Sequence, residues 1–204
     1  MRTGRISKLL LISIVGVLLA GCGLLKSRTA VARSELPAMA WDHRPEATEW
    51  TRSTLVAVRT HGAGLLDIIP SDIKAFCPAY PRASNADRAS FWSGILSTLA
   101  KYESTWRPEV SGGGGRWIGL TQISPQTARA FGCQARTVGA LKDGSANLSC
   151  AVRIAAAQVG RDGALVSENG NWRGLARDWA PFRDETKRAD MASWTRKQAY
   201  CRRK

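Results

Sequence analysis

Histidine is nearly absent from this chain. Its only two histidines, His43 and His61, precede residue 62, and no Cys-x-x-Cys pair is present. A Ser-His-Asp or Cys-His mechanism needs a histidine as its base, and zinc sites are built mostly from histidine and cysteine. The sequence therefore indicates chemistry without a histidine base, and we expect no metal ion and no cofactor.

Acidic residues are also scarce relative to basic ones. The chain has 30 Lys and Arg against 16 Asp and Glu, a formal net charge of +14. Arg2, Arg5 and Lys8 lie in an N-terminal leader, and without them 27 basic residues against 16 acidic ones leave +11. Such an excess favours polyanionic partners such as nucleic acid, anionic lipid or the cell wall, and it also serves solubility alone. The basic residues are scattered rather than clustered in a stripe, so we expect no nucleic-acid partner.

Long apolar runs are limited to one, from Leu9 to Ala20. It is too short to cross a bilayer comfortably, and basic residues precede it as in a secretory signal peptide. It ends in Leu18-Leu19-Ala20-Gly21-Cys22, which resembles the lipobox of bacterial lipoproteins and implies lipid on Cys22. The alternative is an ordinary signal peptide. Gly23 is not the Asp that commonly retains lipoproteins in the inner membrane, so we expect anchoring in the outer membrane, facing the periplasm.

Four cysteines remain besides Cys22. An even number in an exported chain predicts two disulfides, and four cysteines allow three pairings. Cys133 follows one expected helix and Cys150 lies early in the next, so their bridge would join neighbouring elements. Cys77 precedes the helical domain and Cys201 nearly ends it. We therefore predict the pairs Cys133–Cys150 and Cys77–Cys201.

Helical periodicity dominates the second half of the chain. Ser84 or Asn85 can cap a first helix, and Ser124-Pro125 can begin a second that ends at Gly132. Further helices are expected over residues 147–159, over 172–179 and from Asp184 to the end, besides short ones over 50–59 and 71–76. No stretch alternates like a half-buried strand. The sequence therefore predicts an all-α fold.

Four regions follow from these signals. We expect a signal peptide over residues 1–21, a tether over 22–48, an N-terminal extension over 49–83 and a helical catalytic domain over 84–204. The tether is inferred from its mixture of Arg, Ser, Ala and Pro without clear periodicity.

The candidate catalytic group is a single carboxylate. The apolar stripe of the first helix leads one turn further to a glutamate on the same face; these residues are Trp92, Ile95, Leu96, Leu99 and Glu103. Burial there raises the pKa of a carboxylic acid, as a glycosidase general acid needs at neutral pH. The competing interpretation is a glutamate at a frayed helix end that turns toward solvent.

Two motifs place Glu103 in a family context. The chain reads Glu103-Ser104 at a helix end and, after a glycine-rich loop, Gly119-Leu120-Thr121-Gln122-Ile123 and a proline. These motifs resemble the lytic transglycosylases with a soluble-lytic-transglycosylase (SLT) domain, and the third motif of that family resembles residues 147–155. The resemblance covers about residues 84–182. Cys77-Pro78 and the segment from Trp172 to Arg183 are similar to a branch of cysteine-bearing lipoproteins with this domain.

The sequence departs from that family at several points. Thr121 stands where methionine is usual, four consecutive glycines occupy residues 112–115, and the late Tyr-Asn step of the family is missing. These departures concern the expected substrate contacts more than the catalytic glutamate.

The resemblance implies a lysozyme-like helical fold with a glycan-binding cleft. It implies cleavage of the β-1,4 bond between N-acetylmuramic acid and N-acetylglucosamine in peptidoglycan, with Glu103 as acid and base and a 1,6-anhydro product. Gln122 and the backbone near Gly119 would hold the sugar. Ser104 would contact the substrate, orient Glu103 or only cap the helix. Trp117 and Trp179 are candidates for stacking on sugars, with core packing as the alternative.

Two other functions fit the same sequence. One is a hydrolytic lysozyme of the same fold, which would add water across the bond. The other is a non-catalytic lipoprotein that binds peptidoglycan or another polyanion by charge.

Overall fold

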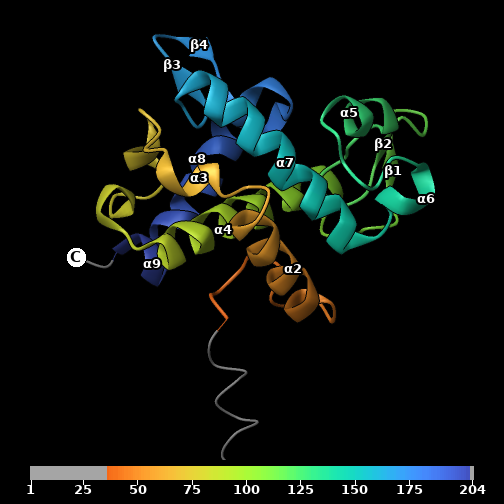
Figure 1. Cartoon of the computed structure of the whole chain (residues 1–204), viewed down its shortest axis with the longest axis horizontal. Helices are drawn as coiled ribbons and strands as arrows, with labels where there is room; N and C mark the ends of the chain where they lie inside the picture. Colours follow the sequence, from red (N-terminus) through yellow and green to blue (C-terminus); the bar gives the residue numbers. More distant parts are fainter. Residues whose placement is uncertain (1–35, 203–204) are drawn as a thin grey trace, which may run out of the picture. The chain divides into compact units, whose positions relative to one another are not determined.

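Helix α4 (Asn85–Ser104) lies at the middle of the structure, a computed structural model that describes residues 36–202 (Figure 1). The hydroxyl of Ser84 accepts a hydrogen bond from the backbone N–H of Asp87 and caps the helix, as expected for a serine at this position. Twelve consecutive residues, 89–100, are buried, so α4 is surrounded by other elements on nearly all sides. A helix buried all round serves as the axis of a core.

Two further helices pack around α4. Helix α2 (Ala47–Arg59) packs against both α4 and α7 (Gly144–Asp162), and the Asp143 side chain caps α7 by accepting from the backbone N–H of Ala146. Helix α7 ends at Gly163, whose φ of +63° is a left-handed conformation that glycine adopts without strain. The core between these helices contains large aromatic side chains, including Trp41, Trp50, Phe91 and Trp92.

Shorter elements complete the fold. They are the helices α3 (Gly64–Asp67), α5 (Pro125–Ala130), α6 (Val138–Leu141), α8 (Glu185–Arg196) and α9 (Ala199–Arg202), and the 3-10 turns η1 (Ile73–Ala75), η2 (Tyr80–Arg82), η3 (Gly174–Arg177) and η4 (Ala180–Phe182). Helices α5 and α6 gather with the first hairpin at one end of the drawn molecule (Figure 1). Within residues 36–202, no helix is both long enough and apolar enough to cross a membrane.

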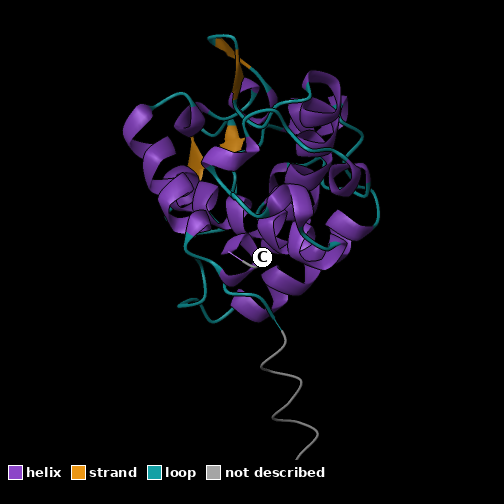
Figure 2. Cartoon of the chain, turned by 90° about the vertical axis from the view of Figure 1, so that its left-hand side faces the viewer, coloured by secondary structure: helices purple, strands orange, loops and turns teal. Residues whose placement is uncertain are grey.

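In the part of the chain that the structure describes, two short hairpins interrupt the helical structure (Figure 2). Strand β1 (Ser111–Gly112) pairs antiparallel with β2 (Trp117–Ile118), with Ser111 opposite Ile118. Strand β3 (Ser167–Glu168) pairs in the same way with β4 (Asn171–Trp172). The prediction of a mostly helical domain is confirmed, although the sequence analysis expected no strands.

Two helix predictions are wrong in detail. Trp172, Leu175, Ala176 and Trp179 have helical spacing, yet β4 and η3 occupy this segment. The reason is Gly174, where φ is +46° and an added Cβ would lie 2.2 Å from the Ala164 carbonyl oxygen. The chain approaches its neighbour too closely there for a regular α-helix. Helix α7, by contrast, begins earlier than expected and continues through Gly160 to Asp162.

The expected tether over residues 22–48 is too long. Residues 36–48 belong to the compact unit, and the Trp41 side chain is 0% exposed. Its indole N–H donates to the Thr51 hydroxyl at 2.9 Å, and the Ala40 N–H donates to the Ser97 hydroxyl at 2.9 Å. The expected boundary at residue 84 also disappears, because α2 and α3 pack on α4 and α7 in one core.

Both predicted disulfides are confirmed. Cys77 is bonded to Cys201, and Cys133 to Cys150, with sequence separations of 124 and 17 residues. The first bridge joins the segment before α4 to the last helix, and the second joins the segment after α5 to α7.

Removing the two bridges should destabilise the protein unequally. A cross-link that closes a longer loop removes more entropy from the unfolded chain. Replacing Cys77 and Cys201 by serine should lower the free energy of unfolding by about 4–5 kcal/mol, against about 3 kcal/mol for Cys133 and Cys150. Urea unfolding of the two double variants measures the difference, and a larger loss for the Cys133–Cys150 pair would contradict this order.

Candidate active site at Glu103

The position of Glu103 is set by the way α4 ends. Glu103 lies in the last turn, and the helix stops because Thr105 and Trp106 both adopt left-handed backbone conformations, each with φ of 53°. Such conformations are unfavourable for residues with a Cβ and persist only where the surroundings enforce them. Here the Trp106 indole N–H donates to the Ser97 carbonyl at 2.8 Å, which folds the chain back along α4. The end of the helix is therefore held rather than frayed.

The Glu103 side chain is half-buried, and this burial controls its charge. Loss of hydration raises the pKa of Glu103 from 4.5 to about 7. Lys187 and Arg183 act in the opposite direction, because their positive charges favour the carboxylate, yet burial outweighs them. Within the described chain, no cation approaches Glu103 to ion-pair distance. Near neutral pH this carboxyl can therefore both donate and accept a proton.

The segment from Ile118 to Gln122 lies against the end of α4 and is fastened there by one amide side chain. Asn147 Nδ2 donates to the carbonyl oxygens of Ile118 at 2.9 Å and Leu141 at 3.0 Å. Its Oδ1 accepts from the Thr121 backbone N–H at 3.0 Å and the Thr121 hydroxyl at 2.7 Å. All four hydrogen-bonding positions of the amide are thus used within a fully buried site. In the sequence Asn147 stands only as the start of a motif, and its role in fastening the loop depends on tertiary contacts.

Gly119 belongs to the site for a steric reason. Its φ is +79°, and an added Cβ would lie 2.2 Å from the Leu141 carbonyl oxygen and 2.4 Å from Asn147 Nδ2. No other residue fits this position without displacing the backbone. Gly119 therefore permits the Asn147 contacts on which the loop depends.

Gln122 is held on the other side of the same loop. Its φ is +50°, and its side-chain Nε2 donates to the carbonyl oxygens of Gly119 at 2.9 Å and Val110 at 3.2 Å. A Cβ on Gly112 would lie 2.5 Å from Gln122 Oε1, so the first glycine of the glycine run makes room for this side chain. Gln122 is only half-buried, so a ligand could still reach it.

Ser104 connects α4 to this loop and does not face solvent. Its hydroxyl donates to the Leu120 carbonyl at 3.0 Å and contacts the Ala100 carbonyl at 3.2 Å, and the side chain is 4% exposed. Direct contact of Ser104 with a substrate is therefore a wrong expectation. The residue fixes the distance between the end of α4 and the loop that carries Gly119 and Gln122.

The two tryptophans expected to stack on sugars differ in their surroundings. Trp117 on β2 is 45% exposed and lies beside Arg116, whose guanidinium carbon is 5.6 Å from the ring centroid. Trp179 is 3% exposed, and its indole N–H donates to the Thr121 carbonyl at 2.9 Å. The stacking role expected for Trp179 is wrong, because the ring is packed beneath the 118–122 loop. Trp117 remains available for contact.

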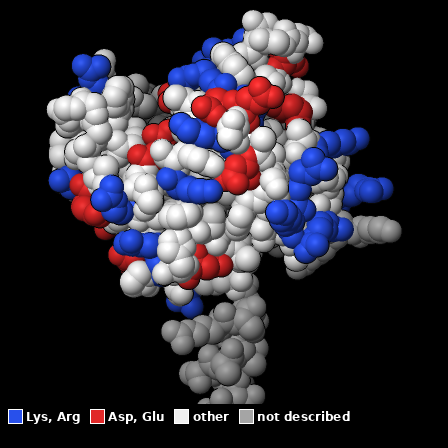
Figure 3. Space-filling model, turned by 180° about the vertical axis from the view of Figure 1, so that it is seen from behind, with Lys and Arg blue, Asp and Glu red and all other residues white. Residues whose placement is uncertain are grey.

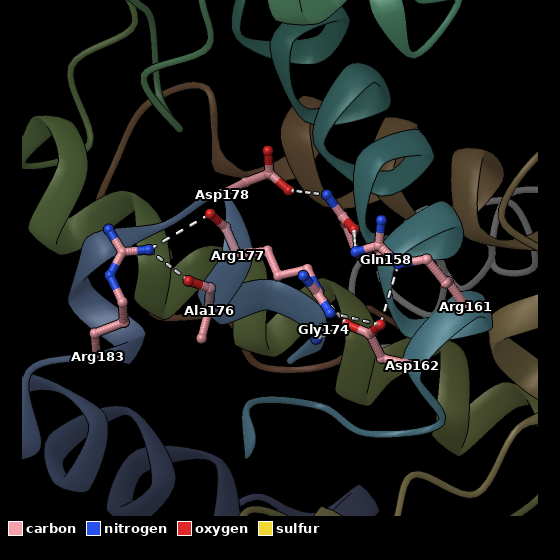
Figure 4. Close-up of polar contacts among 8 residues, drawn as sticks. All are labelled: Gln158, Arg161, Asp162, Gly174, Ala176, Arg177, Asp178 and Arg183. Carbon is pink, nitrogen blue, oxygen red and sulfur yellow. Dashed lines mark hydrogen bonds and ion pairs between the residues drawn. The ribbon is translucent and has the colours of Figure 1, made fainter. Parts of the chain in front are cut away.

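A polar network fixes the segment that carries Trp179 and Arg183 (Figure 4). Asp162 accepts from the Gly174 N–H at 2.8 Å and from Arg177 Nε at 2.5 Å, while Gln158 donates to Asp178. These contacts join η3 to α7. At the far end of the network, Arg183 Nη1 donates to the Ala176 carbonyl at 2.5 Å.

A separate groove of about 920 Å³ lies between α2 and the start of α7. Its lining includes Glu49, Arg52, His61 and Arg153, and none of its lining residues comes from the Glu103 site. We therefore treat it as a distinct feature of the surface.

Comparison with known proteins gives a family through structure. No protein-family model matches the chain, and no curated protein matches it significantly. Among solved structures, a glutamate-to-glutamine variant of DslA from Bdellovibrio is 31% identical, with a TM-score of 0.75, and the match covers 82% of this chain and 99% of that one. The chain belongs to the DslA family.

Two further DslA structures agree with this assignment. Wild-type DslA and a second glutamate-to-glutamine variant are each 30% identical to this chain, with TM-scores of 0.73. Each match covers 82% of this chain and 100% of the DslA chain. The similarity to DslA therefore extends over nearly the whole part of the chain that the structure describes.

The raised pKa of Glu103 should make stability depend on pH. The unfolded chain ionises this group near its ordinary value of 4.5, whereas the folded chain keeps the proton until about pH 7. The contribution of this proton to the free energy of unfolding is therefore fully present below the unfolded pKa. It is lost as the pH rises through the folded pKa, by at most about 3 kcal/mol. Glu103→Gln lacks this titration. It should match the wild type at about pH 4 and be more stable by about 2–3 kcal/mol at about pH 8.

Urea unfolding at the two pH values measures this difference. Glu168→Gln is the matched control, because it removes one carboxylate from an exposed position on β3. A stability difference between wild type and Glu103→Gln that stays constant with pH would contradict a buried, titrating Glu103.

Proposed function

We propose that this protein is a lysozyme-like peptidoglycan lytic transglycosylase of the SLT type. The observation that carries the proposal is the half-buried Glu103 carboxyl at the held end of α4, with its pKa raised to about 7. It lies beside a loop whose Gly119 and Gln122 match the second motif of those enzymes. The substrate would be the glycan strand of peptidoglycan, cut between N-acetylmuramic acid and N-acetylglucosamine.

The proposed reaction uses one carboxyl group twice. Protonated Glu103 donates its proton to the glycosidic oxygen as the bond from that oxygen to C1 of the muramic acid breaks, and positive charge develops on that sugar. The Glu103 carboxylate then takes the proton of the C6 hydroxyl of the same sugar, and O6 bonds to C1. The products are a 1,6-anhydro end and a free 4-hydroxyl, and no water is consumed.

The surroundings of Glu103 support a mechanism with one carboxylate. Between Glu103 and Asp143 the chain has a single other acid, Glu109, and its side chain is exposed. Among residues 36–202, the charges that affect the pKa of Glu103 are those of Lys187 and Arg183, both of them cations. Glycosidases that use water or a covalent intermediate place two carboxyl groups across the scissile bond.

The other contacts of the proposed site come from the loop and the hairpin. Gln122 is half-buried beside the loop backbone, and Trp117 is exposed on β2, so both could bind sugar. Two of the DslA structures carry glutamate-to-glutamine substitutions, at two different positions of that protein.

We also propose export and lipid anchoring. The lipobox with Cys22 lies outside the described residues, so lipid at Cys22, outer-membrane anchoring and a periplasmic location stay predictions. The two disulfides of the folded unit are consistent with an oxidising compartment.

Substitution of Glu103 tests the proposed mechanism. Glu103→Gln keeps the size and hydrogen-bonding capacity of the side chain but cannot transfer a proton. Release of 1,6-anhydro muropeptides from isolated sacculi should fall by at least about 100-fold, the lower range for general acid–base catalysis. Mass spectrometry of the released fragments measures this rate.

Two exposed glutamates provide matched controls. Glu109→Gln and Glu168→Gln should keep the wild-type rate, because both side chains are exposed to solvent and neither is held as a buried carboxyl. Wild-type release by Glu103→Gln would refute the mechanism. Products heavier by one water would identify a hydrolytic lysozyme, and binding of sacculi without release would identify a non-catalytic binding protein.

A further inference from the structure

The mechanism above leaves the two cations beside Glu103 unused. Neither Arg183 nor Lys187 takes part in any ion pair among residues 36–202. Lys187 Nζ lies 5.9 Å from the ring centroid of Tyr102, the residue before Glu103. Arg183 directs Nη1 to the Ala176 carbonyl, and no acidic side chain holds its guanidinium (Figure 4).

The backbone that carries these cations is fixed. The Asp184 carboxylate accepts from the Lys187 N–H at 2.9 Å and caps α8, and Arg188 donates to the Phe182 carbonyl at 2.9 Å. One turn on, Asp190 accepts from Lys101 Nζ at 2.8 Å and from the Tyr102 hydroxyl at 2.6 Å. These contacts hold the start of α8 against the end of α4.

The Arg183 charge also acts on the Asp178 carboxyl, whereas Lys187 has no acidic partner at ion-pair distance among residues 36–202. Lys187 and Arg183 both favour the ionised form of Glu103, and neither is held in an ion pair within the described chain. On the face drawn in Figure 3, basic and acidic side chains are mixed over the centre, whereas basic ones gather along the right-hand edge.

The proposed substrate brings an anion to this place. In muramic acid, the sugar whose C1 bond is cut also carries a lactyl group on C3. Any binding mode that places C1 at Glu103 therefore brings the lactyl group, and the stem peptide attached to it, within one sugar ring of the same carboxyl. A carboxylate there could accept charge-assisted hydrogen bonds from a guanidinium and an ammonium.

We propose that Arg183 and Lys187 bind a carboxylate of the muramic acid unit and thereby select the strand position that is cut. The inference rests on the proposed function. The carboxylate is either the lactyl carboxylate of strands without stem peptides or a carboxylate of the stem peptide. Its binding neutralises the two cations that favour ionised Glu103, so the proton needed for bond cleavage is retained in the complex.

The proposed carboxylate binding is tested by comparing two enzymes on two substrates, with charge removed from the enzyme, from the substrate or from both. The enzymes are the wild type and the Arg183→Gln/Lys187→Gln double variant. The substrates are glycan strands stripped of stem peptides by an amidase, and the same strands with their lactyl carboxylates converted to carboxamides. Amidation should lower the wild-type kcat/KM by about 10- to 100-fold, the range for losing one or two charged hydrogen bonds, and should change the double variant far less.

Controls separate recognition from folding. Lys74→Gln removes an exposed lysine from η1 and should discriminate between the substrates as the wild type does. Thermal unfolding shows whether the double variant is folded. The single variant Lys187→Gln is a second control, because it keeps the hydrogen bond from Arg183 to the Ala176 carbonyl. On amidated strands, Lys187→Gln should also move the alkaline limb of the kcat/KM profile to higher pH, because one cation that favours ionised Glu103 is gone.

Each outcome decides the proposal. A higher wild-type kcat/KM on stripped strands than on their amidated form supports binding of the lactyl carboxylate. If a difference appears only between intact strands with charged and with amidated stem peptides, it supports binding of a peptide carboxylate. Equal cleavage of charged and amidated strands by the wild type, or an equal loss in both enzymes, overturns it. If the wild type cleaves no strand, the proposed function fails. If the protein then also sediments equally with charged and with amidated strands, the proposed carboxylate binding by Arg183 and Lys187 is overturned as well.

Discussion

The candidate site depends on the four hydrogen bonds of one buried amide. Asn147 joins Ile118, Thr121 and Leu141, and so fastens the loop that faces the end of α4. Gly119 is required because a Cβ would collide with this amide, and Trp179 supports the loop from below through the Thr121 carbonyl. Ser104 then joins the loop to α4 one residue beyond Glu103. The surroundings of Glu103 follow from this set of contacts.

A buried carboxyl without an ion-pair partner, such as Glu103, is unfavourable for folding but suited to proton transfer. Burial keeps the Glu103 proton near neutral pH, while the absence of a close ion pair in the described chain leaves the group free to release it. The protein stabilises the arrangement elsewhere, through an aromatic core and two disulfides that close a long and a short loop. Functional groups that lower stability are expected where the surrounding structure enforces them.

Features governed by local chemistry could be predicted from the sequence. Ser84 before α4, Pro125 at the start of α5 and Asp184 before α8 follow from capping rules, and both disulfides follow from the helix order. The position of Glu103 on a buried stripe could also be predicted, because the period of an α-helix relates it to Leu99.

Features that depend on tertiary contacts could not be predicted from the sequence. Lys187 and Arg183 approach Glu103 because α8 and η4 pack on α4, and no spacing along the chain indicates this. Trp179 has the spacing of a helix face, yet the close approach at Gly174 prevents the helix. The sequence did indicate that the expected tether is partly folded, because Met39 and Trp41 are large apolar residues. Both are buried in the structure.

The most direct test of the account is the titration of Glu103 itself. Carboxyl-labelled glutamate in the folded protein, with the resonance assigned by its loss in Glu103→Gln, reports this by nuclear magnetic resonance. The account predicts a midpoint at about 7 for Glu103, displaced toward higher pH in Lys187→Gln. A midpoint near the ordinary value of 4.5 would show a hydrated carboxylate and would contradict its role as the acid.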